Sequence, residues 1–183
     1  MKNNRLFIAV KIPPFALEKI IDIRNEVFNK DKINWEKYEK LHLTLKFIGD
    51  FDKRNLDKLI AELKIISADV NRFKLNFKNF GVFKRNAVPF ILYAGIDFNR
   101  EFLRLHSLID NSLVKFGVAK EKRKFKPHLT LLRIKNKRIN KLEELLAKRI
   151  SYIKFEVDKF YLIQSELKPT GSVYTEIESF KLK

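Results

Sequence analysis

The chain has 183 residues, and its 39 Lys and Arg against 22 Asp and Glu give a formal net charge of +17. Such a field attracts polyanions, so nucleic acid is the favoured partner and an anionic membrane surface the second. The absence of cysteine excludes disulfides, thiolate catalysis and cysteine-ligated metal sites. Three histidines without a His-x₂₋₄-His pair also argue against zinc, and we expect neither a metal nor a cofactor.

Length and hydropathy favour a single domain, residues 1–183, and we expect a cytoplasmic monomer. The hydrophobic fraction of 45%, with 17 Phe, is ample for a core. No stretch reaches the roughly 18 apolar residues that a membrane span needs, so we expect no membrane partner. The apolar segment after Arg5 ends at Lys11, which is too short for a signal peptide.

The first half of the chain alternates short apolar runs with stretches in which apolar residues recur at helical spacing. Pro14 suits the first position of a helix, and Asp52 suits an N-cap. Residues 83–89 are predicted to form a loop. The predicted strands are 6–10, 41–48, 73–78 and 90–96, and the predicted helices are 14–29 and 56–66.

The second half nearly repeats this order. The predicted helices are 100–116 and 137–150, and the predicted strands are 127–132, 155–163 and 173–182, with a turn over 165–171. The chain therefore reads as two tandem α+β halves, about 1–96 and 97–183. We expect each half to contribute one strand to a shared central groove.

Two of the three histidines open the same tetrapeptide, His-Leu-Thr-Leu, at His42 and at His128. A given histidine is followed by Leu-Thr-Leu by chance about once in a thousand times or less. Alternation along a strand places His42 with Thr44, and His128 with Thr130, on one face, about 7 Å apart. The leucines of each copy would anchor the opposite face.

Each copy offers one titratable ring and one hydroxyl on the same surface. Imidazole exchanges a proton near neutral pH, and a hydroxyl can hold an anionic oxygen. Two such surfaces facing each other would place a base on one side of a phosphorus atom and an acid on the other, as in-line displacement requires. A single copy would more often be a half-buried structural histidine, but the repetition favours catalysis.

Three further features are ambiguous from the sequence. His106 lies within a predicted helix without a following Thr, so we interpret it as structural or exposed. The basic run 120–126 is either a solvated loop or a contact to a phosphate backbone. Phe83 and Tyr93 are candidates for base stacking that cannot be told from core residues.

The paired motifs resemble those of the 2H phosphoesterase superfamily, and specifically its RNA 2′,3′-cyclic phosphodiesterase branch, also known as 2′-5′ RNA ligases. The resemblance spans nearly the whole chain; it is carried by the segments 5–10, 41–49, 125–133, 165–167 and 171–174 and by Trp35. It implies a bilobal α+β fold with two antiparallel sheets related by a pseudo-twofold axis, outer helices, a central groove and no metal. It also implies hydrolysis of a terminal 2′,3′-cyclic phosphate to a 2′-phosphate.

The resemblance assigns His42 as the proton donor to the leaving O3′ and His128 as the proton acceptor from water. It assigns substrate binding to Thr44, Thr130, Arg133 and Tyr174. Strict alternation places Arg133, five residues after His128, on the opposite face, unless the strand ends, twists or bulges there. Lys46 is four residues after His42, an even separation, so strict alternation places it on the same face as His42.

The implied partner is RNA with a 2′,3′-cyclic phosphate end, tRNA fragments among the candidates. Three alternatives stay open. The same site run in reverse is a 2′-5′ RNA ligase, with a docked RNA end in place of water. The chain could also be a non-catalytic module that binds RNA ends, or a hydrolase of small cyclic nucleotides, although the charge of +17 favours long RNA.

Overall fold

The computed structural model describes residues 4–29, 32–135, 139–169 and 171–183. Within these residues the strands are β1 (Asn4–Lys11), β2 (His42–Phe51), β3 (Phe73–Arg85), β4 (Val88–Ile96), β5 (His128–Arg133), β6 (Lys154–Val157), β7 (Lys159–Lys168) and β8 (Gly171–Lys181). The helices are α1 (Pro14–Phe28), α2 (Leu56–Asp69), α3 (Arg100–Ser112) and α4 (Leu142–Ala147). No helix in this part of the chain is long and apolar enough to cross a membrane.

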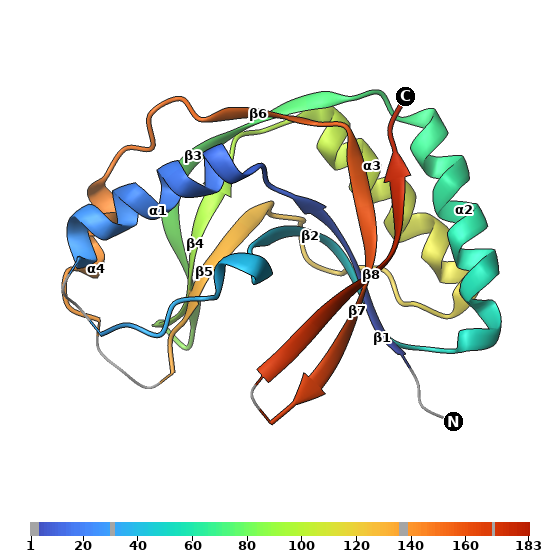
Figure 1. Ribbon diagram of the computed structural model, residues 1–183, viewed down its shortest axis with the longest axis horizontal. Coiled ribbons are helices and arrows are strands. Elements are labelled where there is room, and N and C mark those ends of the chain that lie inside the picture. Colours follow the sequence, from blue (N-terminus) through green and yellow to red (C-terminus); the bar gives the residue numbers. More distant parts are fainter. Residues whose placement is uncertain (1–3, 30–31, 136–138, 170) are drawn as a thin grey trace.

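The strands form one curled antiparallel sheet in the order β6-β3-β4-β5-β2-β1-β7-β8. Figure 1 shows the sheet as an arch, with α1 and α4 outside one lobe and α2 and α3 outside the other. The two strands that open with histidine, β2 and β5, are neighbours at its centre. The predicted α+β fold is confirmed.

The strand order is symmetric about the β2–β5 boundary, because β4 lies beside β5 as β1 lies beside β2. One lobe consists of β6, β3, β4 and β5, and the other consists of β2, β1, β7 and β8. Each lobe of the sheet therefore contains strands from both 1–96 and 97–183. The two lobes do not coincide with these two segments, because each segment contributes two strands to each lobe.

The helices cover the leucine face of the sheet. Leu43 and Leu45 on β2, and Leu129 and Leu131 on β5, are buried in the main core together with α1, α2 and α3 residues. In α3, Phe102, Leu105 and Ile109 recur at helical spacing and are buried, and Asn99 caps the helix by accepting a hydrogen bond from the Phe102 amide.

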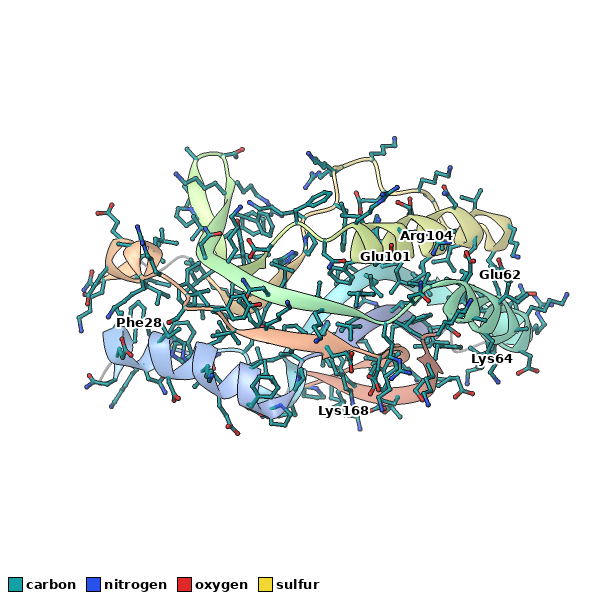
Figure 2. The ribbon with its side chains drawn as sticks, turned by 90° about the horizontal axis from the view of Figure 1, so that it is seen from above. Phe28, Glu62, Lys64, Glu101, Arg104 and Lys168 are labelled. Atoms are coloured by element: carbon teal, nitrogen blue, oxygen red, sulfur yellow. The ribbon has the colours of Figure 1, made fainter. Side chains whose placement is uncertain are left out.

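Charged side chains cover the outer surface of the helices (Figure 2), where Glu101 and Arg104 project from α3, and Glu62 and Lys64 from α2. Arg104 links the two helices, because its Nη2 lies 2.7 Å from Oδ2 of Asp69 at the end of α2. Exposed ion pairs of this kind contribute about 0–1 kcal/mol each. The buried apolar faces therefore hold the helices on the sheet.

Three predicted boundaries are wrong. Residues 83–89 form a hairpin rather than a loop: β3 and β4 meet at Asn86 and Ala87, both with positive φ, as a tight two-residue turn requires. Residues 155–163 are divided between β6 and β7 at Asp158. Most of the predicted turn 165–171 is the hairpin of β7 and β8, paired from Ser165–Tyr174 to Lys168–Gly171, whereas Thr170 lies outside the described residues.

The two helices of the second half are also shorter than the ranges predicted from the spacing of their apolar residues. The first ends at Ser112 and continues as a 3₁₀ turn, Leu113–Phe116, which Gly117 ends with a φ of 79°. The second, predicted over 137–150, is limited to Leu142–Ala147, and residues 137–138 lie outside the described residues. Arg149 instead forms an isolated bridge with Asn79 of β3.

Candidate active site

The two His-Thr pairs lie on the same face of the sheet at its centre, opposite the leucines. His42, Thr44, His128 and Thr130 are each half-buried, and the residues between them are fully buried. The two strands pair antiparallel at Leu43 and Leu129. In that register His42 faces Thr130 and His128 faces Thr44. The structure therefore brings together all four residues of the two motifs.

Both imidazoles are held by the same contact. Nδ1 of His42 lies 2.7 Å from the carbonyl oxygen of Lys40, and Nδ1 of His128 lies 2.7 Å from that of Lys126. A neutral ring then donates its Nδ1 proton to the carbonyl, and Nε2 carries the lone pair. Neither Nε2, nor the hydroxyl of Thr44 or Thr130, has a hydrogen-bond partner among the described residues.

Aromatic rings surround each imidazole. The centroid of the His42 ring lies 4.9 Å from that of Phe7 and 5.6 Å from that of Tyr174. The His128 ring lies 4.8 Å from Phe83 and 5.6 Å from Tyr93. Phe83 and Tyr93, the candidates for base stacking, therefore pack on His128 and on each other, and Tyr93 is only 4% exposed.

This apolar packing favours neutral histidines. Burial lowers the pKa of His42 to about 4, although the bond to Lys40 acts in the opposite direction, and the charges of Arg133 and His128 lower it further. Burial also lowers the pKa of His128, against the bond to the Lys126 carbonyl, and nearby Lys126 and Arg133 add to the effect. Both rings therefore favour the neutral form at neutral pH.

Each central strand has a bulge after its threonine, where one residue has no partner on the neighbouring strand. The extra residue is Leu45 in β2, opposite Ile8 and Ala9, and Leu131 in β5, opposite Leu92 and Tyr93. In β5 the carbonyl of Leu131 accepts a hydrogen bond from the amide of Glu36. Because of the extra residue, the alternation of side chains between the two faces of the sheet is inverted after each bulge.

This change of face decides the roles of Arg133 and Lys46. Arg133 moves to the site side, where its charge lowers the pKa of both catalytic candidates, and its Nε lies 3.2 Å from Oε1 of Glu36. The parity predicted for Lys46 is wrong: its side chain is 6% exposed on the leucine side, and its Nζ lies 2.5 Å from Oδ1 of Asp110. The sequence showed no sign of either bulge.

Lys46 instead connects β2 to α3 and to the chain that leads to His128. Its Nζ also donates to the carbonyl of Ala119, and Asp110 accepts from the amide of Glu121. Burial alone would raise the pKa of Asp110, but the bonds from Lys46 and Glu121 hold it below its ordinary value. This buried pair is structural.

Of the other two ambiguous features, His106 belongs to the core and the basic side chains of the run 120–126 are exposed, with Lys126 beside the candidate site. His106 is buried and stacks on Phe125, with centroids 3.8 Å apart, so its structural interpretation agrees with the geometry. Burial lowers its pKa. In the run 120–126, Lys126 is exposed, and its Nζ lies 4.9 Å from the centroid of Tyr93, beside His128. The remaining basic side chains of this run are also exposed.

Tyr174 and two residues missed from the sequence complete the site. Burial and Glu36 raise the pKa of the Tyr174 phenol, against the charge of Arg133. Glu36 was missed because its proximity to Arg133 depends on the bulge. Phe47 is 65% exposed and packs near Phe7, 6.0 Å between centroids. It follows His42 by five residues, as Arg133 follows His128, so the internal repeat could have identified it.

Two hollows are lined in part by residues of the candidate site. One, of about 220 Å³, includes Lys37, Lys40 and Tyr174 in its lining, and a larger one includes Arg133. Among the described residues there is no group of three His, Asp or Glu side chains able to hold a metal ion. The arrangement as a whole offers two proton carriers, two hydroxyls and one guanidinium to an anion.

Comparison with known proteins identifies the family. The model of LigT-like phosphoesterases matches residues 10–93 and 96–174. Proteins named RNA 2′,3′-cyclic phosphodiesterase from Aquifex aeolicus and Archaeoglobus fulgidus are 31% and 30% identical to this chain, over 186 and 179 residues. The alignments cover 100% and 97% of this chain and 99% of each relative.

Solved structures agree. The protein TT0787 of Thermus thermophilus has a TM-score of 0.81 at 26% identity, with 97% of each chain covered. Escherichia coli LigT in its apo form has a TM-score of 0.83 at 23% identity, covering 100% of this chain and 99% of that one, and shows the same fold. The match to the family model and the full-length relatives establish that the chain belongs to the LigT-like phosphoesterases of the 2H phosphoesterase superfamily.

Proposed function

We propose that this protein is an RNA 2′,3′-cyclic phosphodiesterase that hydrolyses a terminal 2′,3′-cyclic phosphate to a 2′-phosphate by acid–base catalysis with two histidines. The supporting observation is the equivalence of His42 and His128: both are held by a carbonyl at Nδ1, and both have Nε2 free on one face of the sheet. The relatives named RNA 2′,3′-cyclic phosphodiesterase support the same substrate.

The proposed reaction is a single displacement at phosphorus. Nε2 of His128 takes a proton from water as the water oxygen forms a bond to phosphorus. The bond from phosphorus to O3′ breaks, and protonated His42 gives its proton to O3′. The products are a 3′-hydroxyl and a phosphate that remains on O2′. Each proton transfer contributes about 10²–10⁴-fold to the rate.

The other site residues stabilise the charge on the phosphate. The hydroxyls of Thr44 and Thr130 have no competing partner among the described residues, so they are available to the non-bridging oxygens. Arg133 supplies a positive charge, and binding requires that the phosphate share it with Glu36. Tyr174 packs against the edge of His42, where it orients the ring and contacts the ribose.

The proposed substrate is the end of an RNA chain, tRNA fragments included, because the charge of +17 raises the rate of encounter with a polyanion. Hydrolysis needs no metal in this proposal, because the two imidazoles and the strained ring supply the chemistry. A monomer in the cytoplasm remains our expectation.

The first test is hydrolysis of an oligonucleotide with a 2′,3′-cyclic phosphate end in the presence of EDTA, with the phosphate position mapped in the product. We expect a 2′-phosphate from the unmodified protein and a loss of about 10²–10⁴-fold in His42→Ala and in His128→Ala. Tight binding without turnover would leave an RNA-end-binding module. Joining of a 5′-hydroxyl RNA instead of hydrolysis would indicate a ligase.

A further inference from the structure

The larger of the two hollows extends the site beyond Arg133. It lies between the β3–β4 hairpin, residues 133–135 at the end of β5 and residues 139–143 at the start of α4, and we call it the Arg133 groove. The groove includes Arg85, Phe90, Ile91, Arg133, Lys135 and Lys141 in its lining. Its volume of about 1490 Å³ exceeds the roughly 300–1,000 Å³ of pockets for small molecules. It therefore fits a chain better than a single nucleotide.

The charge of the groove complements a phosphate backbone. Among the described residues, its lining includes four basic side chains, Arg85, Arg133, Lys135 and Lys141, and one carboxylate, that of Glu143. Lys141 donates to the carbonyl of Val27, but neither Arg85 nor Lys135 forms an ion pair within the described part of the chain. Both are exposed. These cations are available to neutralise phosphates and release counterions.

The floor of the groove offers apolar surface to bases. The guanidinium carbon of Arg85 lies 5.1 Å from the centroid of Phe90, and Phe90 is only half-buried. Unpaired bases of RNA stack on aromatic rings and on arginine planes, whereas a duplex hides its bases. The hollow beside Tyr174 is much smaller, about 220 Å³, and Glu39 accompanies its two lysines. The Arg133 groove is therefore the better route for the chain.

We propose that the Arg133 groove binds the single-stranded nucleotides that precede the cyclic-phosphate end, with Arg85 and Lys135 contacting their phosphates and the Arg85–Phe90 pair their bases. The inference rests on the proposed function, because Arg133 belongs both to the catalytic site and to the groove. It makes this enzyme selective for RNA ends over nucleoside cyclic phosphates.

The test compares two substrates, adenosine 2′,3′-cyclic phosphate and a single-stranded decamer with the same end. For the double variant Arg85→Ala/Lys135→Ala we expect the KM of the decamer to rise about three- to tenfold per lost contact, with kcat unchanged. The KM of the mononucleoside should not change. Arg72→Ala, which removes one positive charge where the double variant removes two, is the control, because Arg72 precedes the opposite end of β3 and is exposed.

Salt dependence gives a second readout. The slope of log(1/KM) against log of the salt concentration should become shallower by about 0.7 for each phosphate contact that the decamer loses. An unchanged KM for the decamer, or an equal rise for both substrates, would overturn the proposal. So would an equal loss of binding to a duplex of the same length, because the groove is assigned to single strands.

The proposal for the groove can be tested even if the catalytic proposal is wrong. If the unmodified protein hydrolyses neither substrate, fluorescence anisotropy with a labelled decamer ending in a 2′-phosphate still tests the groove. Weaker binding in Arg85→Ala/Lys135→Ala, but not in Arg72→Ala, would then support the groove and reject the enzyme. Equal binding by all three proteins would reject the groove.

Discussion

At the scale of single residues, the protonation of two histidines governs the proposed chemistry. Burial among aromatic rings lowers the pKa of both, that of His42 to about 4. Catalysis needs one ring protonated and the other neutral. When the substrate binds, its negative phosphate raises the pKa of a nearby histidine, because an opposite charge favours the protonated ring.

We therefore predict a bell-shaped dependence of kcat/KM on pH with its maximum between about pH 4 and 6.5, because kcat/KM reports the pKa values of the free enzyme. Above that range the protonated ring is lost, and kcat/KM should fall by about tenfold per pH unit. The maximum for kcat should lie at higher pH, because the bound phosphate raises both pKa values. Initial rates between pH 4 and 9 test this, and a kcat/KM that stays constant up to pH 9 would contradict it.

At the scale of elements, paired strands with a bulge position the charged groups. Each of β2 and β5 carries its histidine and threonine on one face and then changes face at an extra leucine. After the bulge, the site side receives Arg133 from β5 but Phe47 from β2. The two strands therefore carry the same histidine and threonine, but only β5 adds a positive charge to the site. The side of the site next to His128 differs in this way from the side next to His42.

The β3–β4 pair supports His128 through a close contact that admits only glycine. Gly81 lies opposite Tyr93, and a Cβ at Gly81 would lie 2.5 Å from Cζ of the tyrosine ring. We predict that Gly81→Ala displaces Tyr93, lowers the free energy of unfolding by about 1–3 kcal/mol and lowers kcat about tenfold through a misplaced His128. Urea unfolding and initial rates measure the two effects.

A double-mutant cycle provides the control for this prediction. Because leucine lacks the distal ring atoms, Gly81→Ala should cost less stability in a Tyr93→Leu background than alone. Additive effects of the two substitutions would show that the clash is not the cause. In that case the role given to Tyr93 in supporting His128 would be wrong.

At the scale of the whole molecule, stability and function are linked through the same buried rings. The pKa of each of the three histidines is lowered in the folded protein, in each case chiefly by burial. The unfolded chain therefore binds protons below pH 6.5 that the folded protein does not bind. Acid also adds positive charge to a chain that already carries +17.

We predict that the free energy of unfolding is greatest above pH 6.5 and falls as the pH is lowered toward 4. His42 alone accounts for about 3 kcal/mol over that interval, because its pKa is about 4 when folded and near 6.5 when unfolded. Urea unfolding at pH 7.5, 5.5 and 4.5 measures the decrease. His42→Gln should show a smaller decrease, and an equal decrease in both proteins would show that His42 does not contribute to it.

The sequence by itself determined the fold class, the family and the four residues of the two His-x-Thr motifs. These features depend on local patterns: a strand places residues two apart on one face, and the repetition of a rare tetrapeptide is visible without any structure. The main strands and helices followed for the same reason, because apolar periodicity is local. The structure shows these four residues together; their catalytic roles remain proposals.

Only the tertiary structure decided which charged residues reach the site. Arg133 lies on the site face, and Lys46 does not, because each strand bulges where it meets its neighbour; in β5, an amide from Glu36 holds the extra residue. The hairpin at Asn86 and the division of the strands of each half between the two lobes likewise depend on strand pairing. Such contacts join residues far apart in the chain, so no local pattern records them.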